Sequence, residues 1–301
     1  MKKKINWSNV ILVMIFLLGL SLLLYPSISD YWNSFHQSRA IVKYSETVAN
    51  MDNDKYIQEL EDAKEYNKRL TNKTYQWKMT ENEIDEYNSL LNITDSGIMG
   101  YIEIPNLNTT LPIYHGTEEK VLQVAVGHIE GSSLPVGGES THSVISGHRG
   151  LPSAKLFTDL DELEVGDIFM FHVLDDTLTY EVDQIRIVLP DKVNDIEIVE
   201  GEDYSTLITC TPYGINSHRL LVRGHRVENL EHLQAQRVPA DATIVADFKV
   251  AIFIGISIII ILISWLFTKS WYRGLKNNMK KGRVKKKENS ESLYTIRFSE
   301  F

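Results

Sequence analysis

Two long apolar runs stand near the two ends of the sequence. "VILVMIFLLGLSLLLY" covers residues 10–25 and "VAIFIGISIIIILISWLF" covers residues 250–267, and neither run contains a charged residue. Each approaches the roughly 20 apolar residues with which a helix crosses a bilayer. We therefore predict membrane-spanning helices over 10–27 and 248–268. A cleaved signal peptide is the alternative for the first run, but "YPSISDYW", which follows it, is a poor small-residue cleavage site.

After the first run, the polar and apolar positions follow a helical period from residue 30 to about residue 91. "NDKYIQELEDAKEYNKRL" has apolar residues at helical spacing, many good helix formers and no proline. "TENEIDEYNSLL" predicts a second, short helix, in which Thr80 and Glu83 form a capping box. We expect these helices to serve packing or spacing.

From residue 97 the pattern changes to short β-rich runs that Gly, Pro, Asn and Asp separate. Helical spacing returns only over residues 153–163. Several strands at close spacing predict a barrel or a sandwich of about 130 residues, which is large enough for a core of its own. The runs are "GIMGYIEIPNLNTTLPIYHG", "THSVISGHRG", "GDIFMFHVLDDTLTYEVDQIRIVLP", "YSTLITCTPYG" and "HRLLVRGHRV".

The charges give the two runs an orientation. Three lysines precede the first run, and residues 269–301 hold ten basic and three acidic residues, whereas 17 basic and 37 acidic residues lie between the spans. Basic flanks stay cytoplasmic, so we expect both termini inside and the acidic middle outside. The basic stretch "KKGRVKKK" fits this topology and an attraction to anionic membrane lipid. Since it lacks interleaved aromatic residues, we do not predict nucleic acid as a partner.

Cys210 is the only cysteine in the chain, which excludes an internal disulfide and a cysteine-rich metal site. A lone cysteine is usually a small buried hydrophobe. In "YSTLITC", however, strand alternation places Thr206, Ile208 and Cys210 on one face, and the strand ends there because Pro212 and Gly214 follow. A side chain at a strand end beside a turn reaches solvent, which favours a reactive thiol.

The next β-run returns an arginine toward this cysteine. A hairpin through residues 213–217 brings Arg219 near Cys210, where a guanidinium stabilises a thiolate or donates to a developing oxyanion. Arg223 shares the face of Arg219 and is the alternative.

A thiol nucleophile also needs a partner that accepts its proton. Among the nine histidines, His148 stands where the β-run of "HSVISGHRGLP" ends. Three other histidines remain open on spacing alone: His142, His218 and His225. A zinc site is disfavoured because no short His-x-x-x-His or acid-paired spacing occurs, and we predict no cofactor.

The segment "TLITC" resembles the TLxTC signature of sortases, with Arg219 at the family's spacing and His148 upstream on another strand. The blocks "MGYIEIP", "LPIYHGT", "GHIEGSSLPVGG", "HSVISGHRGLPSAKLFTDLD" and "TCTPYGINSHRLLVRGHR" are similar to class C sortases, the pilus-assembly type of Gram-positive bacteria. The resemblance covers about residues 97–227 and the two-span topology. It implies a mainly β fold: a closed eight-stranded barrel with N-terminal helices and two flanking transmembrane helices.

The resemblance and the apolar runs together divide the chain into seven segments of a two-pass membrane protein with an extracellular catalytic domain. They are a cytoplasmic N-terminus (1–9), a transmembrane signal anchor (10–27), an extracellular helical and lid region (28–96), the catalytic barrel (97–229), a juxtamembrane linker (230–247), a transmembrane helix (248–268) and a basic cytoplasmic tail (269–301).

By resemblance, Cys210 is the nucleophile, His148 the proton donor and acceptor, and Arg219 the residue that positions substrate and stabilises the oxyanion. The implied reaction cleaves an LPxTG-like sorting signal between Thr and Gly through a thioester. A lysine amine of the next pilin subunit then forms an isopeptide bond. Anchoring of surface proteins to peptidoglycan is the alternative. A non-enzymatic adhesin would not explain why all three residues stand in matching blocks.

One stretch departs from the family pattern. Many class C sortases carry a lid with an Asp-Pro-aromatic motif, and here "NKTYQWKMTENEIDEY" takes its place. Trp77 matches the aromatic residue, whereas Tyr75 and Gln76 stand where Asp and Pro are expected. Without that carboxylate we expect residues 71–80 to be mobile or displaced and Cys210 to be comparatively open. Two later residues offer a substitute carboxylate: Glu81 and Glu83.

Overall fold

The computed structural model describes residues 7–71, 77–192 and 194–229, together with residues 255, 258, 259, 265 and 269. The chain divides into two compact units, Met1–Ile244 and Val245–Phe301. The helices, the barrel and the candidate site described for this protein belong to the first unit. The predicted linker and, apart from five positions, the predicted second span and basic tail lie outside the described residues.

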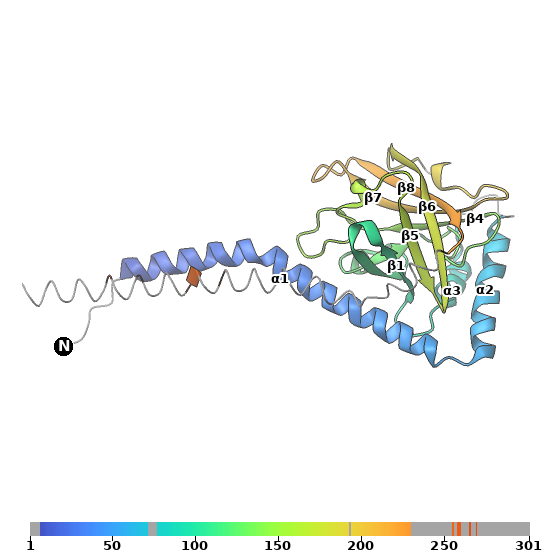
Figure 1. Ribbon diagram of the computed structural model, residues 1–301, viewed down its shortest axis with the longest axis horizontal. Helices are drawn as coiled ribbons and strands as arrows, with labels where there is room; N and C mark the ends of the chain where they lie inside the picture. The colour runs from blue at the N-terminus through green and yellow to red at the C-terminus, as the bar shows by residue number, and fades with distance from the viewer. Residues whose placement is uncertain are drawn as a thin grey trace, which may run out of the picture. The chain divides into compact units, whose positions relative to one another are not determined.

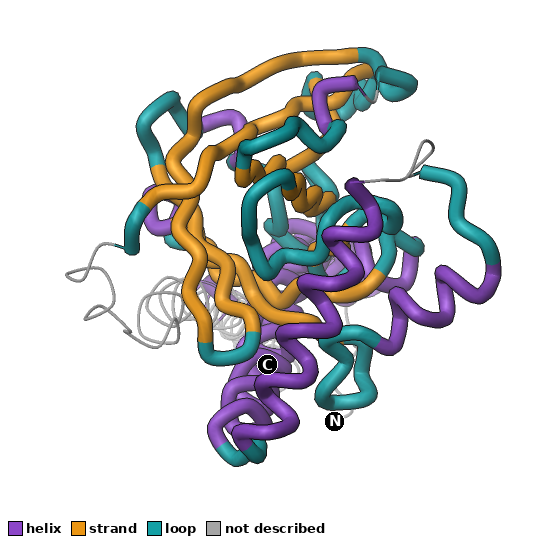
Figure 2. The backbone as a smooth tube through the Cα atoms, turned by 90° about the vertical axis from the view of Figure 1, so that its right-hand side faces the viewer, coloured by secondary structure: helices purple, strands orange, loops and turns teal. Residues whose placement is uncertain are grey.

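Eight strands close into a barrel in the order β1-β2-β3-β4-β7-β8-β6-β5. Figure 2 shows the strands curving around a common interior. Neighbouring strands are antiparallel except for the parallel pairs β2–β3 and β4–β7. The expected closed barrel is confirmed. The strands are β1 (Ile98–Ile104), β2 (Thr109–His115), β3 (Val126–His128), β4 (Thr141–Ser146), β5 (Ile168–Val173), β6 (Asp176–Val188), β7 (Asp203–Thr211) and β8 (His218–Val227).

Alternate positions of the strands fill the barrel. Ile102 and Ile104 of β1, Phe169 and Phe171 of β5 and Val222 of β8 are fully buried and belong to one continuous core. A strand with one face toward a core requires this alternation. The β-runs could therefore be predicted from the sequence.

Two helices pack on the barrel, as Figure 1 shows at one side of the strands: α2 (Asn53–Thr71) and α3 (Glu81–Ser89). The rings of Tyr66 and Tyr87 lie 6.4 Å apart and join the two helices. The Asn67 amide donates to the Leu134 carbonyl (3.0 Å) and accepts from the Leu134 N–H (2.7 Å), which fixes α2 to a barrel loop. The packing role expected of this region is therefore present.

Helix α1 (Trp7–Ala49) is continuous through Pro26 and has two halves of different character. In the described part of the chain, one helix, Val10–Ala49, is long and apolar enough to cross a membrane, and its most apolar window is not buried by the protein. The second half docks on the barrel: the Tyr44 hydroxyl donates to the Met99 carbonyl (2.9 Å) and accepts from the Leu174 N–H (2.7 Å). An apolar helix thus leads directly into the barrel.

The prediction of a helix over residues 153–163 is wrong, because most of that range is not helical. Only a 3-10 turn, η2 (Leu160–Glu162), forms there. The preceding backbone is engaged elsewhere, because the Phe157 N–H donates to the His148 carbonyl (3.2 Å) and the Thr158 hydroxyl accepts from the Gly150 N–H (3.1 Å). The remaining short turns are η1 (Pro105–Leu107), α4 (Glu119–Leu122) and η3 (Asn194–Ile196).

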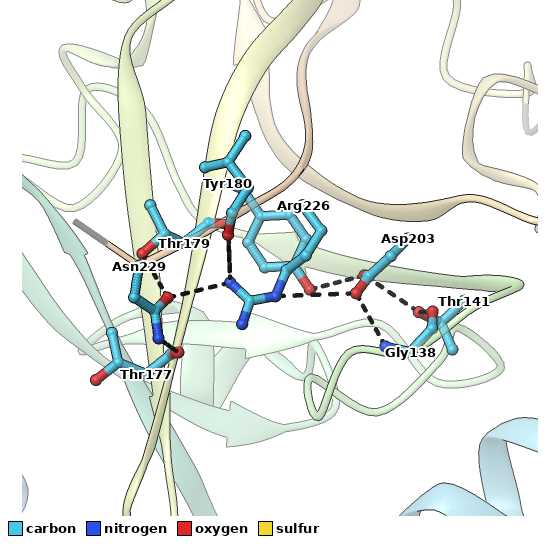
Figure 3. Close-up of polar contacts among 9 residues, drawn as sticks. Gly138, Thr141, Thr177, Thr179, Tyr180, Asp203, Arg226 and Asn229 are labelled. Carbon is cyan, nitrogen blue, oxygen red and sulfur yellow. Dashed lines mark hydrogen bonds and ion pairs between the residues drawn. The ribbon is translucent and has the colours of Figure 1, made fainter. Parts of the chain in front are cut away.

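A polar network closes the end of the barrel at which β7 begins and β8 finishes (Figure 3). The Asp203 carboxylate accepts from the Tyr180 hydroxyl (3.0 Å) and the Gly138 N–H (2.9 Å), and it faces the Arg226 Nε at 4.0 Å. Arg226 also donates to the Thr179 carbonyl at 3.1 Å. Burial raises the pKa of the Asp203 carboxyl above its usual value. The network lies at the opposite end of β7 from Cys210.

Candidate active site

Cys210 and Arg219 face each other across the antiparallel pair β7–β8. Cys210 is registered with Arg219, Ile208 with Leu221, and Thr206 with Arg223. Directly opposed residues of an antiparallel pair project to the same side of the sheet. The predicted hairpin is therefore confirmed, and the partly exposed Cys210 projects to the same side of the sheet as Arg219.

Local carbonyls orient the Arg219 guanidinium. Its Nη1 donates to the carbonyl of Asn216 (3.3 Å), in the turn before β8, and to that of His218 (3.2 Å), the first residue of β8. A guanidinium carries five N–H donors, and among the described residues the Arg219 side chain forms these two hydrogen bonds. The remaining donors suit an oxygen that develops negative charge beside Cys210.

The parallel pair β4–β7 brings His148 to the same strand end. Ser146 of β4 is registered with Ile208. Past that pair, the Gly147 N–H donates to the Ile208 carbonyl (3.0 Å) and the Thr209 hydroxyl donates to the Gly147 carbonyl (2.8 Å). His148 is the next residue, and its side chain is 29% exposed, with Nε2 lying 3.7 Å from the Glu119 carboxylate. Its loop therefore lies beside the end of β7 that carries Cys210.

The three rival histidines have other surroundings. His142 is buried, with Nδ1 2.8 Å from the Glu197 carbonyl and Nε2 2.7 Å from the Thr206 hydroxyl. Burial lowers the pKa of His142 to about 4, so it stays neutral at physiological pH and its ring is committed on both sides. His218 pairs with the Ser217 hydroxyl at 2.9 Å. His225 is registered with Tyr204, toward the far end of β7.

Arg223, the alternative to Arg219, is committed to an ion pair. Its Nε and Nη2 donate to the two oxygens of Asp183 at 3.0 and 2.6 Å, and its Cζ lies 4.1 Å from the centre of the Tyr204 ring. This bidentate pair engages the guanidinium, and Arg223 is registered with Thr206, four residues before Cys210. The geometry thus separates two arginines that spacing alone could not.

A second, smaller apolar cluster continues from Cys210 along the same face. We call it the apolar cluster; its buried members are Val144, Ile196, Ile208 and Leu221, and Trp77, Ile129 and Val188 pack against it. Ile208 lies two residues before Cys210 and is registered with Leu221. An apolar surface therefore begins directly beside the thiol.

Trp77 lies against the apolar cluster, although its segment was expected to be mobile or displaced. The expectation of displacement is wrong for Trp77, because a large apolar ring gains from covering apolar side chains even without a carboxylate to hold it. The indole Nε1 is buried and has no hydrogen-bond partner among the described residues. Tyr75 and Gln76 lie outside the described residues.

Of the two substitute carboxylates, Glu83 has another task. Its carboxylate accepts from the N–H of Thr80 (2.7 Å), while the Thr80 hydroxyl caps α3. The predicted capping box is confirmed, and Glu83 is committed to it. Glu81 is exposed in the first turn of the same helix.

Two residues next to the site were not predicted from the sequence. Arg149 stands beside His148 in "GHRG", and it donates to the Thr211 hydroxyl (3.3 Å) and to Asp161. Glu119 lies far from His148 in the sequence, so only the fold brings the two together. Among the described residues there is no group of three or more His, Cys, Asp or Glu side chains that could hold a metal ion.

Comparison with known proteins agrees with this geometry. The family model "Sortase domain" matches residues 102–227. Sortase D of Bacillus subtilis is 34% identical over 131 residues, which are 42% of this chain and 63% of that protein. The matches to curated sortases thus span less than two thirds of the length of those relatives.

Solved structures match over nearly their whole length. Sortase C1 of Streptococcus agalactiae is 58% identical, with a TM-score of 0.62, over 64% of this chain and 100% of that one. Sortase C of Clostridium perfringens, solved with its C-terminal cell wall sorting motif, is 44% identical (TM-score 0.57; 64% and 99% of the two chains). Sortase C of Streptococcus pneumoniae is 45% identical (TM-score 0.56; 64% and 97%). The chain belongs to the sortase family, and the solved relatives that it resembles are sortases of class C.

Proposed function

We propose that this protein is a membrane-anchored cysteine transpeptidase of the class C type, which joins pilin subunits. The observation that carries the proposal is the pairing of Cys210 with Arg219 at the end of β7, with the His148 loop hydrogen-bonded to the same strand. A thiol, a proton carrier and a fixed donor of hydrogen bonds are the parts that acyl transfer through a thioester needs.

In the first step, the Cys210 thiolate attacks the carbonyl carbon of Thr in an LPxTG-like sorting signal. Arg219 donates hydrogen bonds to the resulting oxyanion. The C–N bond to Gly then breaks, protonated His148 gives its proton to the leaving amine, and a thioester remains on Cys210. In the second step, a lysine amine of another pilin attacks the thioester. The C–S bond breaks, an isopeptide bond forms, and the amine proton passes to His148.

The apolar cluster suits the residues that precede the scissile bond. It begins at Ile208, beside Cys210, and continues to Val144 and Ile196. Apolar residues such as Leu and Pro gain about 25 cal/mol for each Å² that they bury there. Trp77 occupies part of this surface, and we propose that it acts as a lid that substrate must displace. The substrate class is supported by two solved relatives: the sortase C of Clostridium perfringens was solved with the C-terminal cell wall sorting motif, and the structure of the Streptococcus pneumoniae sortase C bears on pilin substrate specificity.

The membrane arrangement is part of the proposal. Among the described residues, helix α1 is the one helix that is long and apolar enough to cross a membrane. We propose a two-pass topology with residues 28–247 outside, 10–27 and 248–268 in the membrane, and both termini inside, because the basic residues lie at the two ends. Enzyme and pilin then share one surface, which raises their effective concentration.

The test uses the full-length protein in detergent micelles with a peptide that carries an LPxTG-like signal. A lysine-bearing pilin fragment and a cell-wall amine are offered as competing acceptors. The proposal expects a product in which the Thr carboxyl is linked to the pilin lysine. Transfer to the cell-wall amine alone would replace pilus assembly by protein anchoring, and no cleavage in either case would refute the transpeptidase.

A further inference from the structure

The side chain of Arg149 connects the two loops that carry His148 and Cys210. Its Nη1 donates to the Thr211 hydroxyl at 3.3 Å, and its Nη2 is bonded to the Asp161 carboxylate. The guanidinium also lies 5.9 Å from the centre of the Tyr213 ring, and the Arg149 side chain is only 10% exposed. Arg149 follows His148, and Thr211 follows Cys210, so the contact joins the direct neighbours of the two proposed catalytic residues.

This contact begins where the backbone pairing of β4 and β7 has ended. The last registered pair is Ser146 with Ile208. One further pair of bonds follows, from the Gly147 N–H and from the Thr209 hydroxyl. Consecutive Cα atoms are about 3.8 Å apart, so a link one residue beyond His148 and Cys210 limits how far those residues can separate.

The other side of the His148 loop is also held. The Phe157 N–H donates to the His148 carbonyl at 3.2 Å, and the Gly150 N–H donates to the Thr158 hydroxyl at 3.1 Å. Gly150 has φ +72°, and a Cβ there would lie 2.8 Å from the Tyr213 ring. The loop therefore lies tightly between η2 and the turn after β7, with Arg149 at the centre of the contact.

The hydrogen bonds of Arg149 stabilise the folded state, but the burial of its side chain also has a destabilising effect. Its Nε is buried and has no hydrogen-bond partner within the described part of the chain. A buried polar group left unpaired lowers the stability of the folded state. An arginine selected for stability alone would satisfy that donor, as Arg223 does with both oxygens of Asp183.

We propose that Arg149 is a positioning residue, which holds His148 at its working distance from Cys210 through Thr211 and Asp161. The inference rests on the proposed function, because it concerns the same reaction. It assigns no chemical step to Arg149: the hydrogen bonds of the guanidinium go to Thr211 and Asp161, and it acts through the chain neighbours of Cys210 and His148. A misplacement of about 1 Å between catalytic groups costs on the order of 10² in rate.

The test compares Thr211→Val with Thr211→Ser in the full-length protein in detergent micelles, with an LPxTG-like peptide and an amine acceptor. Valine keeps the shape of the buried Thr211 and removes its hydroxyl, whereas serine keeps the hydroxyl. We expect Thr211→Val to lower kcat at least tenfold with KM within twofold of wild type, and Thr211→Ser to stay within threefold in kcat. Arg149→Gln should lower kcat similarly, and the double variant with Thr211→Val should lose no more than the worse single variant.

The matched control is Arg226→Gln, at the far end of the barrel (Figure 3). Arg226 is also partly buried and faces a carboxylate, that of Asp203. It lies seven positions beyond Arg219 on β8, about 23 Å away at roughly 3.3 Å per residue. We expect Arg226→Gln to lower the melting temperature as Arg149→Gln does, with kcat within twofold of wild type.

Equal kcat for Thr211→Val and Thr211→Ser would overturn the inference, as would a loss in Arg226→Gln as large as in Arg149→Gln. If Arg149→Gln does not fold, the Thr211 pair decides alone. Failure of the proposed function would be recognised by a different result, because the wild-type protein itself would then form no thioester with the peptide.

Discussion

Replacing Trp77 by Ala should make the apolar cluster accessible to substrate. In the structure, Trp77 covers the side chains of the cluster that begins beside Cys210. A sorting signal that binds there has to displace the indole, so only the fraction of molecules with the indole displaced binds substrate. Removing the indole therefore raises the apparent affinity for the signal, although it removes an apolar contact from the resting protein.

The size of the effect follows from the contacts of the ring. A tryptophan buries about 150–250 Å², which corresponds to about 4–6 kcal/mol at 25 cal/mol per Å². Trp77 is only partly buried, so about 3–4 kcal/mol is gained. The buried indole N–H without a partner costs about 1–3 kcal/mol. The difference between these two ranges is about 0–3 kcal/mol, and its central values of about 1–2 kcal/mol favour the covered state about 5- to 30-fold, since 1.4 kcal/mol is a factor of ten.

The assay measures KM for an LPxTG-like peptide and the rate at which a thiol-reactive sulfonate modifies Cys210. Trp77→Ala should lower KM about 5- to 30-fold and accelerate the modification. Met79→Ala is the matched control, because Met79 belongs to the same segment but packs against the main core; it should leave both quantities within twofold. If KM and the modification rate of Trp77→Ala equal those of wild type, the cluster is open with Trp77 in place, and the lid proposal is refuted.

Three further predictions concern the site and the topology. Cys210→Ala should abolish formation of pilin ladders while the melting temperature changes little, because the partly exposed side chain loses little volume; ladders from this variant would refute the nucleophile. His148→Ala and Arg219→Ala should each lower kcat on the order of 10²–10³, and Arg219→Lys should not rescue, since an ammonium cannot replace a planar fork. Arg223→Ala should lower kcat less than Arg219→Ala does. If kinetic assays show the reverse, the active-site arginine is Arg223 and not Arg219. Protease added to intact protoplasts should digest residues 28–247 and spare the basic tail; protection of the barrel would overturn the topology.

The sequence was sufficient for the elements whose pattern is local. Strand alternation in "YSTLITC" put Ile208 and Cys210 on one face, and the short turn before β8 returned Arg219 to them, as the register shows. The capping box of Thr80 and Glu83 follows from four adjacent residues, and it was found for the same reason. Closure of the barrel came only from the resemblance, because pattern alone allowed a sandwich.

Contacts between segments that are distant in the sequence could not be predicted from it. Glu119 approaches His148, and Arg149 approaches Thr211, only because β2, β3, β4 and β7 are neighbours in the barrel. The position of Trp77 could not be predicted from the missing carboxylate, because the apolar cluster on which Trp77 packs is formed by segments that are distant in the sequence. Helical spacing over residues 153–163 also misled, since tertiary hydrogen bonds to the His148 loop replace the helical ones.

The most direct test of the account is the capture of the thioester. The full-length protein is mixed with an LPxTG-like peptide without an acceptor amine and quenched in acid, and its mass is measured intact and after digestion. The account predicts a mass increase equal to the peptide portion that ends in Thr, located on Cys210, removed by hydroxylamine and absent from Cys210→Ala. A peptide that is cleaved between Thr and Gly without any adduct on Cys210, or an adduct that persists in Cys210→Ala, would contradict it.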